Sequence, residues 1–150
     1  MTPDPLRELY QEIILDHYKR PRNHGCVEGA TAHGEGHNPL CGDRIEVTLK
    51  LENDIVTEIA FDGAGCAIST ASASLMTELV KGKSRSEVNR LFREFRTVVT
   101  EPDADLPDDL GDLAALAGVR EHPVRIKCAT LAWHTLNAAL AGEDAPVKTE

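Results

Sequence analysis

Residues 44–66 read RIEVTLKLENDIVTEIAFDGAGC, and their pattern is the strongest indication of the fold class. Apolar and polar side chains alternate over 44–51 and again over 55–62, and a period of two is typical of half-buried β-strands. The pair Asn53-Asp54 between the two runs predicts a turn, so the runs should form an antiparallel hairpin with one face packed against other elements. In the second run, the alternation predicts that four side chains lie on the packed face: Ile55, Thr57, Ile59 and Phe61.

The segments around this hairpin are mostly helical in pattern. Apolar spacing and capping residues predict helices from Pro5 to Pro21, from Cys66 to Gly82, from the Ser84–Glu87 capping box to just before Pro102, over 110–117, and from a point between Pro123 and Cys128 to Gly142. Strands followed by a run of helices indicate an α+β domain, in which helices cover one face of a small antiparallel sheet of three strands.

Three segments fall outside this regular pattern. Residues 23–40 are rich in Gly and His without a period, which indicates a long loop that could hold one irregular edge strand. Residues 101–109 form an acidic, solvated connection. We expect a single domain over 1–142 and a disordered tail over 143–150.

The composition argues against several classes of function. A formal net charge of −9 without Lys/Arg clusters argues against nucleic acid or an anionic membrane surface as the main partner, and no stretch approaches the length of a membrane span. The acidity fits either a protein partner with a basic surface or simple solubility. Four cysteines in 150 residues do not make a disulfide scaffold, and the first residues lack the apolar run of a secretion signal, so we expect a reducing cytoplasm.

Three of the cysteines stand at predicted boundaries between elements. Cys41 lies in the run Pro39-Leu40-Cys41-Gly42-Asp43, Cys66 follows Gly65 at a helix start, and Cys128 lies near the start of the last helix. Thiols at such boundaries can converge on one ion, and a helix N-terminus helps to hold their negative charge. Because the loop before the first strand and the helix start after the second strand share one end of the hairpin, Cys41 and Cys66 should lie close together.

A tetrahedral ion bound by three thiolates needs one more ligand, and Asp43 is near enough to Cys41 to supply it. The excess negative charge of such a site could be offset by Arg125, by Lys127 and by the helix that follows Gly65. The alternative is that the cysteines are ordinary core residues. We favour that alternative for Cys26 alone, because the other three stand at Pro- and Gly-containing breaks or at a helix start.

The six histidines are rival ligands. His24, His33 and His37 precede Cys41 in the irregular segment and could reach a metal ion, although isolated loop histidines are usually just solvated. His134 should point away from Cys128, since the two are six residues apart on one helix. We expect His17 and His122 at the surface.

Several motifs along the chain resemble those of one known family. They are Leu9-Tyr10, Asp16-His17-Tyr18, Pro21-Arg22-Asn23, Asn38-Pro39-Leu40-Cys41-Gly42-Asp43, Gly65-Cys66-Ala67-Ile68-Ser69 and Val124-Arg125-Ile126-Lys127-Cys128. Together, in this order, they resemble the NifU N-terminal/IscU superfamily of iron–sulfur cluster assembly proteins, and most closely its SufU branch. Scaffold members carry a histidine before the third cysteine, where this chain has Lys127, and the long connection between Cys66 and Cys128 is also typical of the SufU branch.

The resemblance implies an IscU/NifU-N-like fold and a site that holds zinc through Cys41, Asp43, Cys66 and Cys128. It further implies a sulfurtransferase that accepts persulfide sulfur on Cys41 from a pyridoxal-phosphate cysteine desulfurase of the SufS type, stimulates that enzyme, and passes the sulfur on to a downstream iron–sulfur assembly scaffold. Two alternatives stay open. The same thiolates could hold a [2Fe–2S] cluster in a scaffold, or the site could be a structural zinc module for protein interaction.

Overall fold

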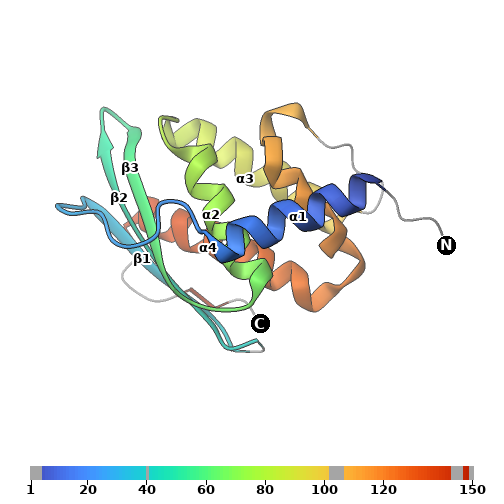
Figure 1. Cartoon of the computed structure of the whole chain (residues 1–150). Coiled ribbons are helices and arrows are strands. Elements are labelled where there is room, and N and C mark those ends of the chain that lie inside the picture. The colour runs from blue at the N-terminus through green and yellow to red at the C-terminus, as the bar shows by residue number, and fades with distance from the viewer. Residues whose placement is uncertain (1–4, 40, 102–106, 143–146, 149–150) are drawn as a thin grey trace.

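The computed structural model describes residues 5–39, 41–101, 107–142 and 147–148. Helices pack on one face of a sheet whose strand order is β3-β2-β1-β4 (Figure 1). The helices are α1 (Pro5–Lys19), α2 (Ala67–Val80), α3 (Arg85–Thr100), the 3₁₀ helix η1 (Asp108–Glu121) and α4 (Pro123–Ala141), and the strands are β1 (Ala32–Asn38), β2 (Asp43–Glu52), β3 (Ile55–Ala64) and β4 (Val147–Lys148). The predicted α+β class with three antiparallel strands is confirmed, and β4 adds a short parallel strand.

The hairpin of β2 and β3 turns at Asn53 and Asp54, as predicted, and both residues adopt the positive φ that tight hairpin turns require. A register shift between Lys50 and Leu51 changes which residues of β3 face the helices. Val56 is fully buried there, whereas Ile55 is 39% exposed. The prediction that Ile55 and Thr57 lie on the packed face is therefore wrong, because a β-bulge reverses the alternation at the start of the strand.

The strand β1 was predicted only as an irregular edge strand, but it pairs with β2 along its whole length. Its inward positions are Gly34, Gly36 and Asn38, all buried. A Cβ atom on Gly34 would lie 2.7 Å from the carbonyl oxygen of Thr135, so α4 packs directly on the backbone of β1. The strand therefore has almost no apolar side chains, and hydrophobic periodicity could not detect it.

The strand β4 corrects the expectation of a disordered tail. Val147 and Lys148 pair in parallel with Gly36 and His37, so they belong to the sheet and β1 is not an edge strand. Residues 143–146 and 149–150 lie outside the described part of the chain, as do 102–106 of the acidic connection. The short helix expected over 110–117 lies within η1, which a kink interrupts at Gly111, where φ is 53° and ψ is −131°.

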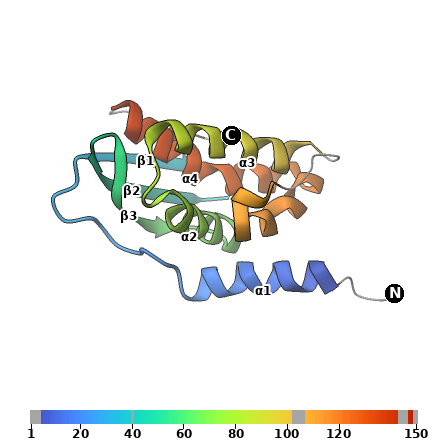
Figure 2. The same ribbon diagram turned by 90° about the horizontal axis from the view of Figure 1, so that it is seen from above.

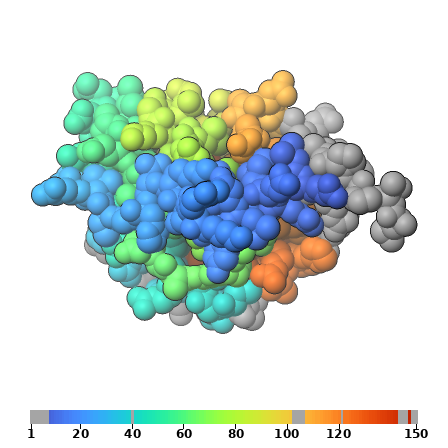
Figure 3. All heavy atoms as spheres, viewed as in Figure 1, coloured from blue at the N-terminus to red at the C-terminus, as the bar shows by residue number. Residues whose placement is uncertain are grey.

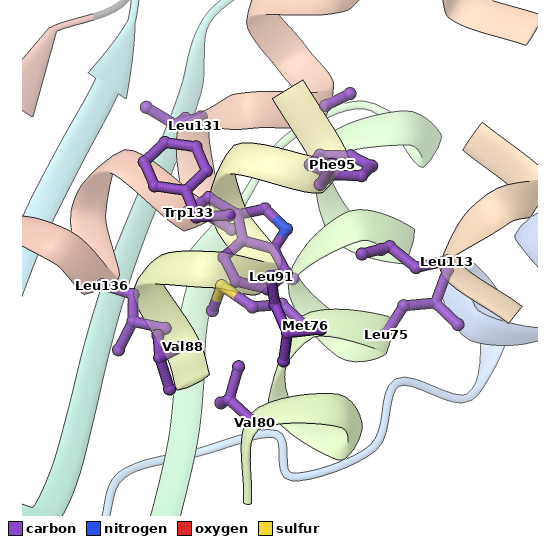
Figure 4. Packing of buried hydrophobic residues seen from close by; sticks show 14 of the residues in the cluster. Leu75, Met76, Val80, Val88, Leu91, Phe95, Leu113, Leu131, Trp133 and Leu136 are labelled. Atoms are coloured by element: carbon purple, nitrogen blue, oxygen red, sulfur yellow. The ribbon is translucent and has the colours of Figure 1, made fainter. Parts of the chain in front are cut away.

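The core lies between the sheet and the helices. α4 packs along β1 and β2, and α2 packs on β3 (Figure 2). Trp133 of α4 is 1% exposed and lies near Phe95 in the middle of the buried hydrophobic cluster (Figure 4). Its ring stacks on those of Phe92 and Phe95, at centroid distances of 5.7 and 5.8 Å. The helix α3 begins at Ser84, whose Oγ accepts the N–H of Glu87, so the predicted capping residue is confirmed. Within the described residues, no helix combines the length and the apolar character that crossing a membrane requires.

The helix α1 forms an outer layer over α2 and η1 (Figure 3). His17, which we expected at the surface, is only 4% exposed in the interface between α1 and α2. The hydroxyl of Ser74 accepts the N–H of Arg22 at 2.9 Å and lies 2.7 Å from Nδ1 of His17, to which it can donate. A neutral imidazole that accepts the Ser74 hydroxyl proton on Nδ1 fits this arrangement, and its Nε2 then faces the carboxylate of Glu78 at 3.7 Å.

Burial and, next, the charge of Arg22 lower the pKa of His17 below its ordinary value of 6.5, against the raising effect of Glu78, Asp16 and Asp112. Because the folded pKa lies below the unfolded one, the stabilisation from neutral His17 is complete above pH 6.5 and is lost as the pH falls through the folded pKa. We therefore expect the free energy of unfolding to decline between pH 7 and 5, and to decline less steeply in His17→Gln.

Denaturant titrations of both proteins at several pH values, with a chelator present to exclude metal binding, measure the two slopes. His134, whose pKa burial also lowers, accounts for part of the slope that remains. Equal slopes in the wild type and in His17→Gln would contradict the prediction.

Candidate metal centre

The structure brings together Cys41, Asp43 and Cys128, whose ligand atoms all lie within 4.8 Å of one another. The Sγ atoms of Cys41 and Cys128 are 3.3 Å apart. Cys41 lies in the turn between β1 and β2, where its N–H donates to the carbonyl oxygen of Asn38 and Gly42 adopts a left-handed φ of 71°. Asp43 opens β2, and Cys128 is in the second turn of α4. Residues far apart in the sequence thus meet at one end of the sheet.

Cys66 lies beside this group but outside its 4.8 Å limit. Its backbone N–H donates to Oδ1 of Asp43 at 2.8 Å, and its Sγ is 3.9 Å from Oδ2 of the same carboxylate. This close approach depends on Gly65, because a Cβ atom there would lie 2.7 Å from Oδ1 of Asp43. Cys66 is also the N-cap of α2, and its Sγ accepts the N–H of Ser69 at 3.4 Å. The carboxylate of Asp43 therefore links Cys66 to the other two sulfurs.

The surroundings of the sulfurs control their charge. Burial and the hydrogen bond to Cys41 raise the pKa of the Cys128 thiol well above its ordinary value. The charge of Cys66, with smaller effects from Cys128 and Cys41, raises the pKa of Arg125, which is exposed in the first turn of α4. A cation beside Cys128 would favour loss of its proton, and Arg125 is one of the three counter-charges that the sequence indicates for this cluster.

Two cavities reach the cluster, and Arg125 and His122 line both of them. A cavity of about 690 Å³ opens over Cys41 and is lined also by His122, Pro123 and Val124. Val124 is 51% exposed, so an apolar side chain lies at the surface next to the partly exposed Cys41. A second cavity of about 470 Å³ lies between α1, α2, η1 and α4, and its lining includes Tyr10, Ile14, Cys66, Ile68, Val119 and Arg125. Among the residues that the structure describes, neither lining contains a carboxylate, although the chain as a whole is strongly acidic.

Of the rival ligands, His122 lines both cavities, whereas Cys26, His24 and His134 make contacts elsewhere. Cys26 is exposed, so the expectation that it is an ordinary core residue is wrong, and its Sγ donates to the Glu46 carboxylate at 3.7 Å. His24 contacts the ring of Phe61, and His134 packs against the ring of Phe92. In the parts of the chain that the structure describes, no histidine belongs to a group of three possible metal ligands.

One residue at the site was not predicted as functional. Asn38, the last residue of β1, is fully buried, and its Nδ2 donates to Sγ of Cys128 at 3.5 Å. Its Oδ1 has no hydrogen-bond partner among the described residues. The sequence shows Asn38 only as the first residue of the motif that contains Cys41, and nothing in residue type or spacing reveals this contact.

The residues present fit a thiophilic metal ion. Asp43 is 1% exposed, and the ion pairs of the described residues do not include it. A buried carboxylate without a counter-charge is costly, and a bound cation removes that cost. Thiols combined with a carboxylate suit zinc or iron better than calcium or magnesium.

The chain is similar in sequence to proteins of iron–sulfur cluster assembly. The sequence model of the family described as "NifU-like N terminal domain" matches residues 9–143. The zinc-dependent sulfurtransferase SufU of Bacillus subtilis (strain 168) is 45% identical over 139 residues, which cover 93% of this chain and 94% of that protein. The iron–sulfur cluster assembly scaffold protein IscU of Streptococcus pyogenes serotype M1 is 44% identical over 140 residues, which cover 93% of this chain and 87% of that protein. Because these two identities are nearly equal, sequence identity does not choose between the two functions.

Solved structures show the same fold. A protein described as an iron–sulfur cluster assembly scaffold for the SUF system, from Fervidobacterium islandicum AW-1, superposes with a TM-score of 0.81 at 32% identity and covers 89% of this chain and 98% of that one. The N-terminal part of a NifU-like protein from Brucella abortus gives a TM-score of 0.82 at 22% identity, covering 91% of this chain and 95% of that one, which shows likeness of fold alone.

Proposed function

The chain belongs to the family of NifU-like N-terminal domains, and from this premise and the geometry of its sulfur cluster we propose that it is a zinc-dependent sulfurtransferase in iron–sulfur cluster assembly. Sulfur arrives as a persulfide from a pyridoxal-phosphate cysteine desulfurase of the SufS type and leaves for a downstream assembly scaffold. The observation that carries the proposal is the position of Cys41, which lines the open cavity while touching the buried thiol of Cys128. A reducing compartment such as the cytoplasm is part of the proposal, because the chemistry requires free thiols and the four cysteines are free.

The proposed zinc ligands are Cys41, Asp43, Cys66 and Cys128. Three of these side chains already lie together, and the fourth, Cys66, is held next to Asp43 by a backbone hydrogen bond. A free cysteine with a pKa of about 8.5 is mostly protonated at neutral pH, and bound zinc would keep the ligand thiols deprotonated. This donor set explains why a carboxylate is buried among sulfurs.

In the proposed transfer step, the thiolate of Cys41 attacks the outer sulfur of the donor's persulfide. A new S–S bond forms on Cys41 as the S–S bond of the donor breaks, and the donor cysteine leaves as a thiolate that takes up the proton of the transferred sulfur. The sulfane sulfur keeps its oxidation state, so the step needs no external oxidant or reductant. Arg125, next to both cavities, can offset the negative charge of the arriving persulfide.

Cys41 is the proposed acceptor because its surroundings allow it to move. It lies in a turn beside Gly42 and is partly exposed. Cys66 is fixed as the N-cap of α2, and Cys128 is fully buried in α4. A residue that must reach into another protein belongs on the turn rather than on a packed helix.

The test is the turnover of a partner cysteine desulfurase with zinc-loaded and with chelator-stripped protein. We expect zinc-loaded protein to stimulate turnover, stripped protein to leave the desulfurase at its basal rate, and added zinc to restore stimulation. Equal stimulation by the stripped protein would remove zinc from the mechanism.

A scaffold for a [2Fe–2S] cluster is the second candidate function, because IscU relatives match this chain almost as well as SufU does. Anaerobic purification separates the two. A coloured, iron-containing protein that passes its cluster to an apo-protein would support the scaffold, whereas a colourless zinc protein that stimulates the desulfurase would support the sulfurtransferase.

A further inference from the structure

The buried side chain of Asn38 has no evident role in packing the sheet. The other two inward positions of β1 are glycines that let α4 approach the backbone, whereas position 38 carries a polar amide with 0% exposure. Half of the hydrogen-bonding capacity of this amide is unused, because Oδ1 has no partner among the described residues. A buried, unpaired carbonyl oxygen costs about 1–3 kcal/mol, so something besides fold stability accounts for an asparagine here.

The side-chain amide of Asn38 donates a hydrogen bond to the sulfur of Cys128. Nδ2 of Asn38 lies 3.5 Å from Sγ of Cys128, and both side chains are fully buried. A metal-bound thiolate is an acceptor, so it must face the N–H₂ end of the amide, and the opposite orientation would set two lone-pair-bearing atoms against each other. Outer-shell hydrogen bonds of this kind orient metal ligands and strengthen the site.

The three sulfurs differ in the donors that they receive. Sγ of Cys66 accepts the backbone N–H of Ser69, and Sγ of Cys128 accepts from Asn38. For Cys41, the hydrogen bonds of the described residues include no N–H donor to the sulfur, whose partner is the thiol of Cys128. An N–H donor draws charge from a thiolate, which makes that thiolate less nucleophilic and keeps it in place. Two sulfurs therefore accept an N–H, whereas among the described residues the sulfur of Cys41 has a hydrogen bond only from the thiol of Cys128.

We infer that Asn38 is a positioning residue that keeps Cys128 in the ligand set while Cys41 is away from it carrying sulfur. The inference rests on the proposed function and adds to it a residue that touches neither substrate nor metal. Without Asn38, the site is held more weakly, and the departure of Cys41 releases the ion.

The primary variant is Asn38→Leu, which removes the amide at similar size, and Asn38→Asp keeps the shape but turns a carboxylate toward the sulfur. The matched control is Thr135→Val, which removes another buried polar group of the β1–α4 interface, whose Oγ1 donates to the carbonyl oxygen of Leu131. By chelator competition, we expect zinc affinity to fall about 10-fold to 100-fold in Asn38→Leu, and further in Asn38→Asp, with little change in the control.

A spectroscopic readout separates this role from a merely structural one. In cobalt-substituted protein, a hydrogen bond to a thiolate lowers the energy of its lone pairs, so its loss should move the sulfur-to-cobalt charge-transfer band to longer wavelength in Asn38→Leu. During desulfurase turnover, a fluorescent zinc chelator should detect release of the ion from Asn38→Leu, while wild type and Thr135→Val retain it.

Affinity, band position and zinc retention in Asn38→Leu equal to those of Thr135→Val would overturn the inference. If Asn38→Leu does not fold, the same three measurements on the shape-preserving Asn38→Asp decide it. If wild-type protein accepts no persulfide at all, the proposed function fails, and affinity and band position still decide whether Asn38 supports the site.

Discussion

The Cys41→Ser variant is expected to carry no persulfide and to leave a partner desulfurase at its basal rate. A serine hydroxyl keeps the size of the side chain but cannot form the S–S bond that stores the sulfur. Cys41 is also the one cluster cysteine on a turn beside a left-handed glycine, so neither Cys66 nor Cys128 can replace it at the open cavity. Peptide mapping by mass spectrometry after turnover locates the persulfide, and alanine production measures the rate.

The control for this variant is Cys26→Ser. Cys26 is exposed and bonded to Glu46, away from the cluster, so both persulfide formation and stimulation should stay at wild-type level. Persulfide found on Cys66 or Cys128 of the wild-type protein would refute the assignment to Cys41. Unfolding of Cys41→Ser, together with a zinc-loaded wild type that never accepts sulfur, would instead favour a structural zinc module.

Much of the fold follows from local patterns in the sequence. The alternation of apolar and polar residues predicts the hairpin. The capping residues Ser84 and Gly142 predict the start of α3 and the end of α4. The pattern does not predict β1, because its inward positions Gly34 and Gly36 allow close packing of α4 and carry no apolar side chain.

Where the predictions failed, tertiary contacts decided the structure. The bulge beside Lys50 depends on how β2 and β3 pair, and no feature of either strand alone fixes it. His17 looks like a surface residue of an amphipathic helix, and only the contact with Ser74 on α2 shows that it is buried.

The sequence predicted which side chains gather at the candidate site, but not what surrounds them. Boundary positions and residue types singled out Cys41, Asp43, Cys66 and Cys128, and the structure brings three of them within 4.8 Å, with Cys66 beside Asp43. Asn38 was not predictable, because an asparagine before a proline is ordinary in turns and its contact with Cys128 joins residues that are 90 positions apart.

The Asp43→Asn variant should separate metal binding from fold stability. Asparagine keeps the shape and an oxygen that can accept the N–H of Cys66, but it removes the charge of a carboxylate that is 1% exposed. Outer-shell partners alone change metal affinity by about 10-fold to 100-fold, so loss of a direct ligand should weaken zinc by at least about 100-fold, or about 2.7 kcal/mol. Metal-free Asp43→Asn should be at least as stable as metal-free wild type, because a buried carboxylate without an ion pair is costly.

Asp62→Asn is the matched control, because Oδ1 of Asp62 also accepts a backbone N–H, that of Gly63, but its side chain is exposed on β3. Chelator competition gives the zinc affinity, and denaturant unfolding with and without zinc gives the two stabilities. Unchanged affinity in Asp43→Asn would exclude Asp43 as a ligand. If metal-free Asp43→Asn is less stable than metal-free wild type, the carboxylate stabilises the fold without metal. The burial of Asp43 would then no longer be evidence for a bound cation. We therefore expect Asp43→Asn to weaken zinc binding without lowering the stability of the metal-free protein. Both effects have one cause, because the charge that binds the ion is the charge that the metal-free protein must bury.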